Sequence, residues 1–449
     1  MTYTNNPEKA FSRPSRAPPN PRLLFSPAPM ENGKGMLSSM PNLLRLLVAT
    51  CLLIASAACS DGAREEPGAS ESMKIGLLLD FSDAPETSAD RKRAFDLAIR
   101  HVNEAGGVLG RPVEAVEADA TRDPELGVDA ARRLVESEGV HAIVGPNASA
   151  VALPVAEMVA GPAGVPIISP SATSPRLTAA ADDGYFFRTA LSDTAQGPVL
   201  ARVTAERGFD NVGLVYVDDP YGQGLAGSFE ESWDGQVRSV PVDRGQTAHL
   251  ADLQVSAGGG AQALVVITFE QQALAIVQEA LQEGIYTQFV FSDASKRLSL
   301  VREIGGDRLG DMYGTAGAPA PANDATAAWD AAFAAAYGGP PQVTYVKETY
   351  DATIALALAA QAAGSLDGAA IRDQLRSIAS PPGETISGTP DGIAEALRLL
   401  ADGRQIDYQG VANSLDWDST GDLLQGYIGT WRFTRDEWIQ DLETILFQN

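Results

Sequence analysis

Apolar runs of strand length alternate with segments of helical periodicity along most of the chain, beginning at Met73. This alternation predicts a parallel sheet with helices on both faces, because parallel strands need a long crossover connection. A first unit of this kind ends at Ala190. Its strands are predicted at Met73–Asp80, Arg111–Asp119, Val140–Gly145, Val165–Ser169 and Tyr185–Ala190, and its helices at Ala89–Ala105 and Pro124–Glu138.

A second unit repeats the scheme from Thr194 onward. Two successive open α/β units predict two lobes, and ligands of such sheets bind beyond the carboxyl ends of the strands. The sequence therefore predicts a cleft that strand-end loops of both lobes line. The strands of the second unit are predicted at Val212–Val217, Gln236–Val242, Ala263–Phe269 and Gln288–Ser292, with helical patterns such as Glu270–Glu283 between them.

The last third of the chain is rich in alanine, which favours helices. Its final segment, Ile406–Phe433, alternates aromatic and polar residues around WDSTGD and predicts terminal strands that return to the second lobe. We therefore assign residues 73–190 and 317–405 to lobe 1, and residues 191–316 and 406–449 to lobe 2. The alanine-rich helices are predicted at Ala325–Tyr337, Glu348–Ala363, Ala369–Ser377 and Asp391–Ala401.

The 449-residue chain has a formal net charge of −25. A field of this sign repels phosphate groups, so we expect no nucleic-acid partner. The two cysteines, Cys51 and Cys59, lie in one N-terminal apolar segment, which leaves the folded part without a disulfide or a cysteine nucleophile. The three histidines, His101, His141 and His249, share no metal-ligand spacing, and we expect no metal and no cofactor.

The apolar run Leu46–Ala58 follows a basic residue and is too short to span a membrane as a mature helix. This layout is typical of a secretory signal. The tetrad Ser56-Ala57-Ala58-Cys59 resembles the lipobox of bacterial lipoproteins, which implies a lipid on the Cys59 sulfur. An ordinary signal peptide with an incidental cysteine, or a buried core helix, is the alternative. We expect residues 1–58 to be an N-terminal extension and signal peptide, and the polar residues 59–72 to be a flexible tether.

Two hydroxyl-rich loops follow neighbouring predicted strands of lobe 1. The loop Gly145–Ala150 puts Ser149 at the start of a helix, where free N–H groups and the helix dipole favour an anion. The loop Ser169–Pro175 lies at the same sheet edge, so both loops can converge on one carboxylate. Helix capping by Ser149 or Asn147 and an ordinary Ser/Pro turn are the alternatives.

Two further loops belong to lobe 2. The segment Asp218–Gly227 contains GxGxxG after a strand, as dinucleotide sites do. However, two aspartates, a proline and Tyr221 separate that strand from the first glycine, so the helix would not meet a pyrophosphate, and the carboxylates would repel it. Asp293 follows the strand of the FSDAS segment, where it can pair with a ligand ammonium group. A surface aspartate that begins a turn is the alternative.

In this order, the four loops resemble those of the type I periplasmic binding proteins, specifically the branched-chain amino acid and amide binding family of ABC importers. The resemblance runs from Met73 to the C-terminus. It implies an α/β fold with two doubly wound lobes that close like a Venus flytrap about a multi-strand hinge. It rests on IGLLLDFS, HVNEAGGVLGRPVE, IVGPNAS, IISPSATSPRLT, YGQGLA, EGIYTQFVFSD and YQGVANSLDWDSTGD.

The resemblance also implies which residues hold the α-groups of an amino acid. The ligand carboxylate falls on Ser149 and Thr173, with backbone groups near Ala148 and Ser171 contributing. The ligand ammonium falls on Asp293, where the family commonly has an acidic residue.

Three aromatic residues are implied around the rest of the ligand. Tyr221 matches an aromatic residue that closes over the ligand from lobe 2. Phe269 stands where the leucine/isoleucine/valine-binding protein has a tyrosine, so one polar contact is missing. Phe81 lies in the first-strand loop, which matches a region that covers the side-chain pocket.

The resemblance implies a binding protein and not an enzyme. We expect an exported monomer, in the periplasm or at the cell surface, that a lipid anchor attaches to a bacterial membrane. It would capture a small amino acid or amide by hinge closure and present it to the permease subunits of an ABC importer. A sensor with the same fold, which reports its ligand to a signalling or regulatory partner, is the alternative.

Overall fold

A five-stranded parallel sheet lies in the N-terminal part of residues 71–448, which the computed structural model describes. Its strand order is β2-β1-β3-β4-β5. The central strands are buried on both faces and are therefore almost entirely apolar, whereas the edge strand is largely exposed and has acidic residues. The strands are β1 (Lys74–Leu79), β2 (Glu114–Asp119), β3 (Ala142–Val144), β4 (Ile167–Ser169) and β5 (Phe186–Arg188).

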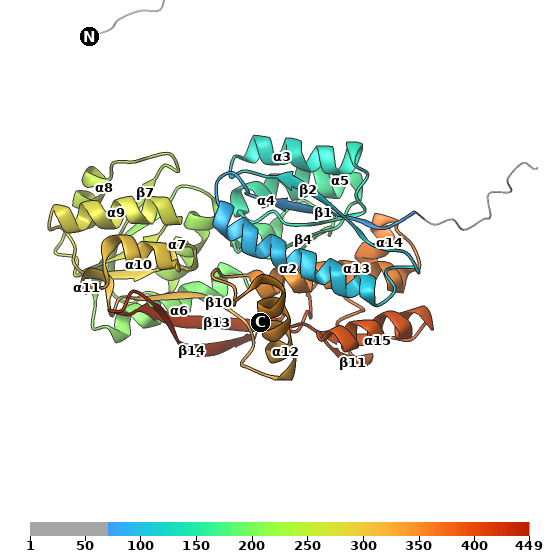
Figure 1. The fold of residues 1–449 in the computed structure, drawn as a ribbon. Helices are drawn as coiled ribbons and strands as arrows, with labels where there is room; N and C mark the ends of the chain where they lie inside the picture. Colours follow the sequence, from blue (N-terminus) through green and yellow to red (C-terminus); the bar gives the residue numbers. More distant parts are fainter. Residues whose placement is uncertain (1–70, 449) are drawn as a thin grey trace, which may run out of the picture. The chain divides into compact units, whose positions relative to one another are not determined.

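Helices cover both faces of this sheet. The side chains of Ile75 and Leu77 pack with α2 (Pro85–Glu104) and α13 (Val346–Ala363), whereas Leu78 packs with the helices of the other face. Figure 1 shows α2 beside α13, although the two helices lie far apart in the sequence. The other face has α3 (Pro124–Arg132), η1 (Arg133–Ser137), α4 (Ser149–Val155), η2 (Ala156–Ala160), α5 (Gly161–Ala163) and the short η3 (Pro175–Ala179).

A second sheet has seven strands in the order β14-β13-β10-β9-β8-β6-β7. The strands from β6 to β10 are parallel to one another. Strand β13 runs antiparallel to β10, and β14 runs antiparallel to β13. The strands are β6 (Asn211–Val217), β7 (Gln236–Val242), β8 (Ala263–Ile267), β9 (Phe289–Phe291), β10 (Tyr313–Ala318), β13 (Gln425–Phe433) and β14 (Ile439–Gln448). The helices are α6 (Asp193–Glu206), α7 (Pro220–Ser232), α8 (Leu250–Ser256), α9 (Glu270–Gln282), η4 (Asp293–Ser295), α10 (Leu298–Ile304) and α11 (Gly306–Leu309).

The alanine-rich part of the chain returns to the first sheet. Alanines of α13 are fully buried between that sheet and its neighbouring helices, because their small side chains permit close packing. The remaining elements of this part are α12 (Asp324–Tyr337), α14 (Gly368–Leu375), α15 (Pro390–Ala401), β11 (Glu384–Ser387) and β12 (Ile406–Gln409). The predicted start of the return to lobe 2, at residue 406, falls on β12, which pairs with β11; the chain joins the second sheet only at β13.

We call the first sheet with its helices lobe 1 and the second sheet with its helices lobe 2. The chain passes between them three times: after β5, after β10 and before β13. The predicted α/β fold of two doubly wound lobes with a multi-strand hinge is thereby confirmed. The predicted residue boundaries of the lobes stay a prediction, and the boundary at 316/317 falls within β10.

A buried ion pair joins two of these crossings. The Arg188 guanidinium, at the end of β5, donates from Nε and Nη2 to the two carboxylate oxygens of Asp422, each at 2.6 Å. The Trp417 indole N–H donates to the carbonyl of Arg188 at 2.8 Å. Arg188 is completely buried, and a two-pronged pair of this kind fixes both position and orientation. The first and third crossings are therefore held side by side.

Two predicted features lie outside the described residues: the signal peptide within residues 1–58 and the lipid anchor at Cys59. The predicted tether, residues 59–72, lies outside them except for its last two positions. Between residues 71 and 448, no single helix combines the length and the apolar composition needed to cross a membrane; the bent pair of α13 and α14 meets these criteria only together.

Candidate functional site

A cavity of about 310 Å³ lies between the two lobes. Its walls come from loops that follow the carboxyl ends of strands in both lobes, as the sequence predicted. Six of the eight predicted ligand-binding residues line it: Ala148, Ser149, Ser171, Tyr221, Phe269 and Asp293. The structure therefore brings together residues that lie as far apart in the sequence as Ala148 and Asp293.

Asp293 is the buried acid of the lobe 2 wall. It follows β9, and its side chain is 5% exposed. The Tyr221 hydroxyl donates to its Oδ1 at 2.7 Å, the Tyr345 hydroxyl donates to its Oδ2 at 3.1 Å, and the Gln196 amide donates to its Oδ1 at 3.2 Å. Burial, and then the nearby Asp293 charge, raises the pKa of both tyrosines well above the usual value, so both stay protonated donors. Three neutral donors thus hold the carboxylate in place.

The local sequence explains how Tyr221 reaches this carboxylate. Asp219 caps α7 by accepting the backbone N–H groups of Tyr221 and Gly222, at 2.9 and 3.0 Å. A Cβ atom on Gly222 would lie 2.0 Å from the carbonyl oxygen of Val217, so only glycine lets the helix start this close to β6. The first glycine of GxGxxG therefore serves the close packing of α7 on β6, whereas the last, Gly227, has open space beside it. This agrees with our rejection of a dinucleotide site.

Ser149 lies in the lobe 1 wall at the first residue of α4. Its Oγ accepts the backbone N–H of Ser174 at 3.2 Å, which leaves its own proton available to a ligand. No side chain caps α4, and the Asn147 amide instead donates to the Asp80 carboxylate. The alternative that Ser149 or Asn147 merely caps the helix is thus not what the structure has.

Two predicted residues do not line the cavity. Thr173 is buried behind the wall, where its backbone carbonyl accepts the N–H of Asp193 at 2.8 Å and its side chain lies beside the Asp193 carboxyl group. Phe81 packs partly buried against the core, and its neighbours Asp80 and Asp83 line the cavity instead. Unlike the six lining residues, Thr173 and Phe81 therefore do not present their side chains to the cavity.

Asp193 is a second buried carboxyl group close to Asp293. It is completely buried at the start of α6. Burial, and then the charge of Asp293, raises its pKa well above the usual value. Two like charges this close cannot both be ionised without a large cost, so Asp193 is the group that holds a proton.

Sequence reasoning missed three arginines that line the cavity: Arg91, Arg122 and Arg297. Arg122 follows the carboxyl end of β2, and Arg297 follows η4, so the rule that strand ends form the site could have found both. Arg91 lies inside α2 and gave no such signal. Tyr345, which precedes α13, was missed for the same reason.

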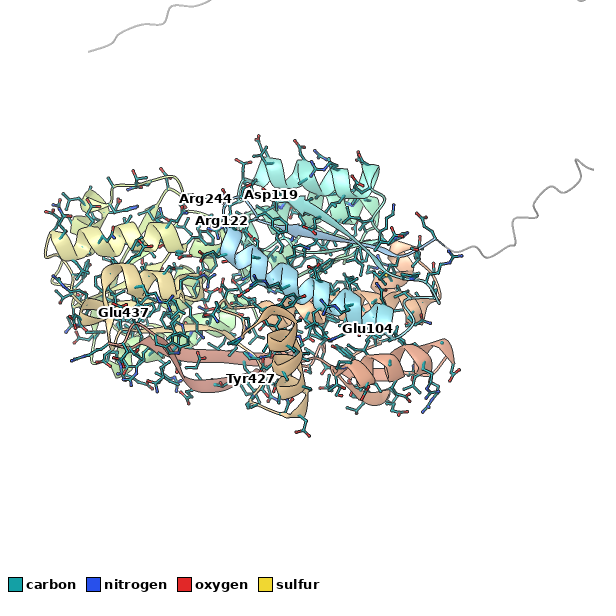
Figure 2. The ribbon with its side chains drawn as sticks, in the orientation of Figure 1. Glu104, Asp119, Arg122, Arg244, Tyr427 and Glu437 are labelled. Carbon is teal, nitrogen blue, oxygen red and sulfur yellow. The ribbon has the colours of Figure 1, made fainter. Side chains whose placement is uncertain are left out.

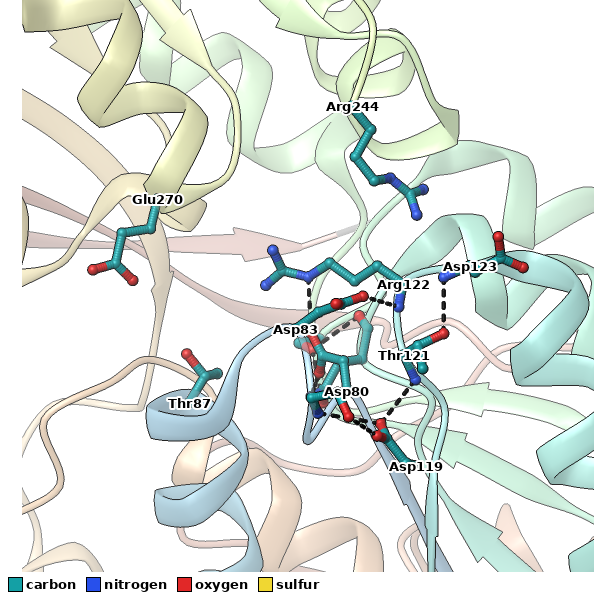
Figure 3. Close-up of polar contacts among 12 residues, drawn as sticks. Asp80, Asp83, Thr87, Asp119, Thr121, Arg122, Asp123, Arg244 and Glu270 are labelled. Carbon is teal, nitrogen blue, oxygen red and sulfur yellow. Dashed lines mark hydrogen bonds and ion pairs between the residues drawn. The ribbon is translucent and has the colours of Figure 1, made fainter. Parts of the chain in front are cut away.

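A network of aspartates positions Arg122. Its Nε donates to Asp80 at 2.9 Å, and its backbone N–H donates to Asp83 at 2.7 Å. Asp119 accepts from the Thr121 N–H in the same turn, as Figure 3 shows. The guanidinium carbon lies 4.1 Å from the centroid of the Phe269 ring, across the cavity. Figure 2 marks Arg122 where the lobes face each other.

Within the described chain, no group of three or more His, Cys, Asp or Glu side chains is arranged to hold a metal ion. Two doubly wound lobes, three crossings and a cavity lined by fixed charged groups from both lobes define a two-lobed binding protein. The arrangement can hold a small molecule that has both a cationic and an anionic group.

A family comparison agrees with this class. The model of a family described as periplasmic binding protein matches residues 72–399, and the chain belongs to that family. A curated relative is the chemotactic signal transduction system substrate-binding protein BasB of Halobacterium salinarum, 27% identical over 80% of this chain and 87% of the relative. Another is the leucine-, isoleucine-, valine-, threonine-, and alanine-binding protein of Pseudomonas aeruginosa, 27% identical over 83% and 91%.

Solved structures share the fold. The leucine-binding protein LivK of Thermotoga maritima superimposes with a TM-score of 0.70 at 22% identity, covering 83% of this chain and 98% of that protein. LivJ of Streptococcus pneumoniae, in complex with isoleucine, gives a TM-score of 0.69 at 23% identity, covering 84% and 100%. The predicted membership of the type I periplasmic binding proteins is confirmed.

Proposed function

We propose that this protein captures a small amino-acid-like ligand outside the cytoplasm by closure of its lobes and delivers it to an ABC importer. The observation that carries this proposal is the Asp293 carboxylate, which is buried and oriented by Tyr221 and Tyr345 on one wall of the cavity. An ammonium group suits that carboxylate, and a ligand carboxylate suits the Ser149 hydroxyl on the other wall. No chemical step is needed.

The remaining predicted residues take secondary roles in this proposal. Ser171 and Ala148 offer backbone groups next to Ser149, and Thr173 acts through its backbone because its side chain lies behind the wall. Tyr221 and Phe269, whose ring centroids lie 5.5 Å apart, form the lobe 2 surface over the ligand.

Contacts between the lobes support a closure mechanism. Asp293 and Tyr221 belong to lobe 2, whereas Tyr345 belongs to lobe 1, so the Asp293 carboxylate is held by both. The Ser174 hydroxyl of lobe 1 also donates to the carbonyl of Pro220 in lobe 2 at 2.6 Å. A ligand bound between such walls stabilises the closed form through its higher affinity for it.

The names of the relatives support the ligand class. The Pseudomonas aeruginosa relative is named for five amino acids, and the Streptococcus pneumoniae structure contains isoleucine. A second candidate function is sensing, because the Halobacterium salinarum relative is named as part of a chemotactic signal transduction system. Ligand capture is common to both functions, and only the downstream partner differs.

A ligand screen tests the capture step. Thermal shift of the purified protein with the proteinogenic amino acids, their amides and small aromatic acids should reveal stabilisation by at least one amino acid, because a ligand of the native state raises the melting temperature. Stabilisation by none of the amino acids or amides would contradict the proposal.

The partner and the anchor need separate tests. For import, uptake of the identified ligand should fall in cells that lack this protein. Normal uptake together with a lost chemotactic response to the ligand would favour sensing. For the anchor, incorporation of labelled palmitate should disappear in Cys59→Ser. Palmitate retained by that variant would show that the anchor is elsewhere.

A further inference from the structure

Three arginine side chains give one end of the cavity a charge that an ordinary neutral amino acid side chain does not match. Arg91 and Arg122 come from lobe 1, and Arg297 comes from lobe 2. Arg91 is 4% exposed and Arg297 is 9% exposed. Buried guanidinium groups need acceptors for their N–H groups and a compensating negative charge.

Arg91 has neutral partners only. Its Nη1 donates to the Ser171 hydroxyl at 2.8 Å, and its Nε and Nη2 donate to the carbonyl of Thr344 at 3.3 and 3.2 Å. In the part of the chain that the structure describes, no carboxylate lies within 4.0 Å of it. Burial lowers its pKa to about 10, which still leaves it charged at neutral pH. Arg91 is thus a buried cation on the cavity wall without an ion-pair partner.

Arg297 and Arg122 approach the cavity from opposite lobes. Arg297 donates to the Lys296 carbonyl at 2.9 Å and to the Thr87 hydroxyl of lobe 1 at 3.3 Å, and Glu270 lies 3.8 Å from its Nε. Burial is the main cause that lowers the pKa of Arg297; the Glu270 carboxylate counteracts it in part, and the nearby charge of Arg122 lowers the pKa further. The two cations therefore repel each other where the lobes must meet.

Arg122 keeps hydrogen-bonding capacity on its cavity side. Its Nε is used by Asp80, whereas its two Nη groups have no hydrogen-bond acceptor among the described residues. Figure 3 shows them pointing into the space between Thr87 and Glu270 with no dashed line to either. A carboxylate placed there would accept from this fork and lie between the opposing cations.

The acidic residues around the cavity compensate these cations only in part: the charge of Asp80 raises the pKa of Arg91, and the charge of Glu270 raises that of Arg297, but burial lowers both pKa values by more. Asp80 is fully engaged by Arg122 and the Asn147 amide, and Asp83 accepts the backbone N–H of Arg122. Glu86 and Glu303 are exposed at the mouth, where water solvates them. Asp293 lies on the wall where the three neutral donors hold it. Glu270 pairs with Arg297 and accepts the Ser299 hydroxyl. Among the described residues, the two Nη groups of Arg122 therefore remain donors without an acceptor at this end of the cavity.

We propose that the ligand is an amino acid with an acidic side chain, whose second carboxylate lies between Arg122 of lobe 1 and Arg297 of lobe 2, near the charge of Arg91. This inference rests on the proposed function and deepens it, because the α-ammonium and α-carboxylate sites are those already assigned. An aliphatic side chain in the same place would bury the two Nη groups of Arg122 without an acceptor.

Matched ligand pairs test the proposal. Isothermal titration of the purified protein with L-glutamate, L-glutamine, L-aspartate, L-asparagine and L-leucine compares side chains of nearly the same shape with and without charge. We expect at least one acidic amino acid to bind about tenfold or more tightly than its amide, and more tightly than leucine. Equal or tighter binding of the amides or of leucine would overturn the inference and leave the proposed function standing. Binding of no amino acid would instead contradict the proposed function.

A variant identifies the subsite. Arg297→Gln should weaken the preferred acidic ligand about tenfold while changing its amide by less than about threefold, so the preference collapses. Arg308→Gln, an exposed arginine of the same lobe, is the matched control and should change neither. Where Arg297→Gln fails to fold, as circular dichroism would reveal, Arg122→Gln takes its place. A preference for the acid that survives in the folded variant would overturn the assignment.

Discussion

The two ends of the cavity are built on different principles. Around Asp293, neutral hydroxyl and amide donors from both lobes hold one carboxylate, and the neighbouring carboxyl group of Asp193 has a raised pKa. Around Arg122 and Arg297, several full charges of both signs lie close together and are only partly paired. At the first end both oxygens of Asp293 already accept hydrogen bonds. At the second end the two Nη groups of Arg122 have no acceptor among the described residues. We infer that the first end fixes the groups common to all amino acids and that the second end selects the side chain.

The largest effect is expected at the first end. Asp293→Ala should weaken every amino acid ligand by about a hundredfold, because the ligand ammonium loses its buried partner. Isothermal titration measures this, with the exposed Asp307→Ala as the control. An affinity within about threefold of the wild-type value would show that the ammonium binds elsewhere.

A smaller loss is expected opposite Asp293. Ser149→Ala removes one hydroxyl donor to the ligand carboxylate and should weaken binding about tenfold for acidic and neutral ligands alike. The exposed Ser232→Ala should have no effect. A loss confined to one ligand class would mean that Ser149 contacts the side chain, and the contrast between the two ends would be wrong.

At the second end, Phe269→Leu removes the ring that faces the Arg122 guanidinium. The cation–π contact is worth about 0.5–1 kcal/mol, so binding of an acidic ligand should weaken about threefold while binding of its amide stays unchanged. The two titrations are compared in the same buffer. An equal loss for both ligands would show that Phe269 acts as an apolar surface only.

The smallest effect on affinity is expected at Asp193. Because its raised pKa keeps it protonated, Asp193→Asn is nearly isosteric and should leave ligand affinity within about twofold. Stability should respond instead. The folded state holds a proton that the unfolded state releases near 3.8, so the wild-type free energy of unfolding falls as pH rises from there through the folded pKa.

The variant lacks this proton linkage. Urea unfolding at a series of pH values should therefore show the wild type losing stability relative to Asp193→Asn as pH increases. Parallel plots of unfolding free energy against pH for the two proteins would mean that Asp193 is ionised in the folded protein.

The same contrast explains what the sequence could predict. Strand and helix alternation predicts both sheets, because period and length are local properties. Ser149, Tyr221 and Asp293 belong to contiguous loops after apolar strands, so their place in the cleft follows from topology. By contrast, Arg91 is one of several arginines in a helix, and only the packing of α2 against the segment before α13 turns it inward.

Details that depend on tertiary packing were also beyond the sequence. Thr173 and Phe81 lie in the right loops, but backbone turns send their side chains into the interior. The pairing of Arg122 with Asp80 joins two loops that are 42 positions apart, and no local sequence pattern predicts it. The sequence therefore predicted the cleft and the residues proposed to hold the ligand α-groups, but not the arginines proposed to determine selectivity.

The buried pair of Arg188 and Asp422 also determines how the lobes can move. Breaking such a pair costs about 3–5 kcal/mol, so we expect it to persist during opening and to act as the pivot. Asp293 lies on the pivot side of the cavity, because the buried Asp193 interacts electrostatically with both Asp293 and Arg188. Gln196 links Asp293 to Thr315 of the crossing strand β10 as well. Rotation then displaces a point in proportion to its distance from the pivot. We therefore expect the ammonium end to shift less than the end around Arg122, so distance labels placed across the cavity near Arg122 would report each opening event with the larger amplitude.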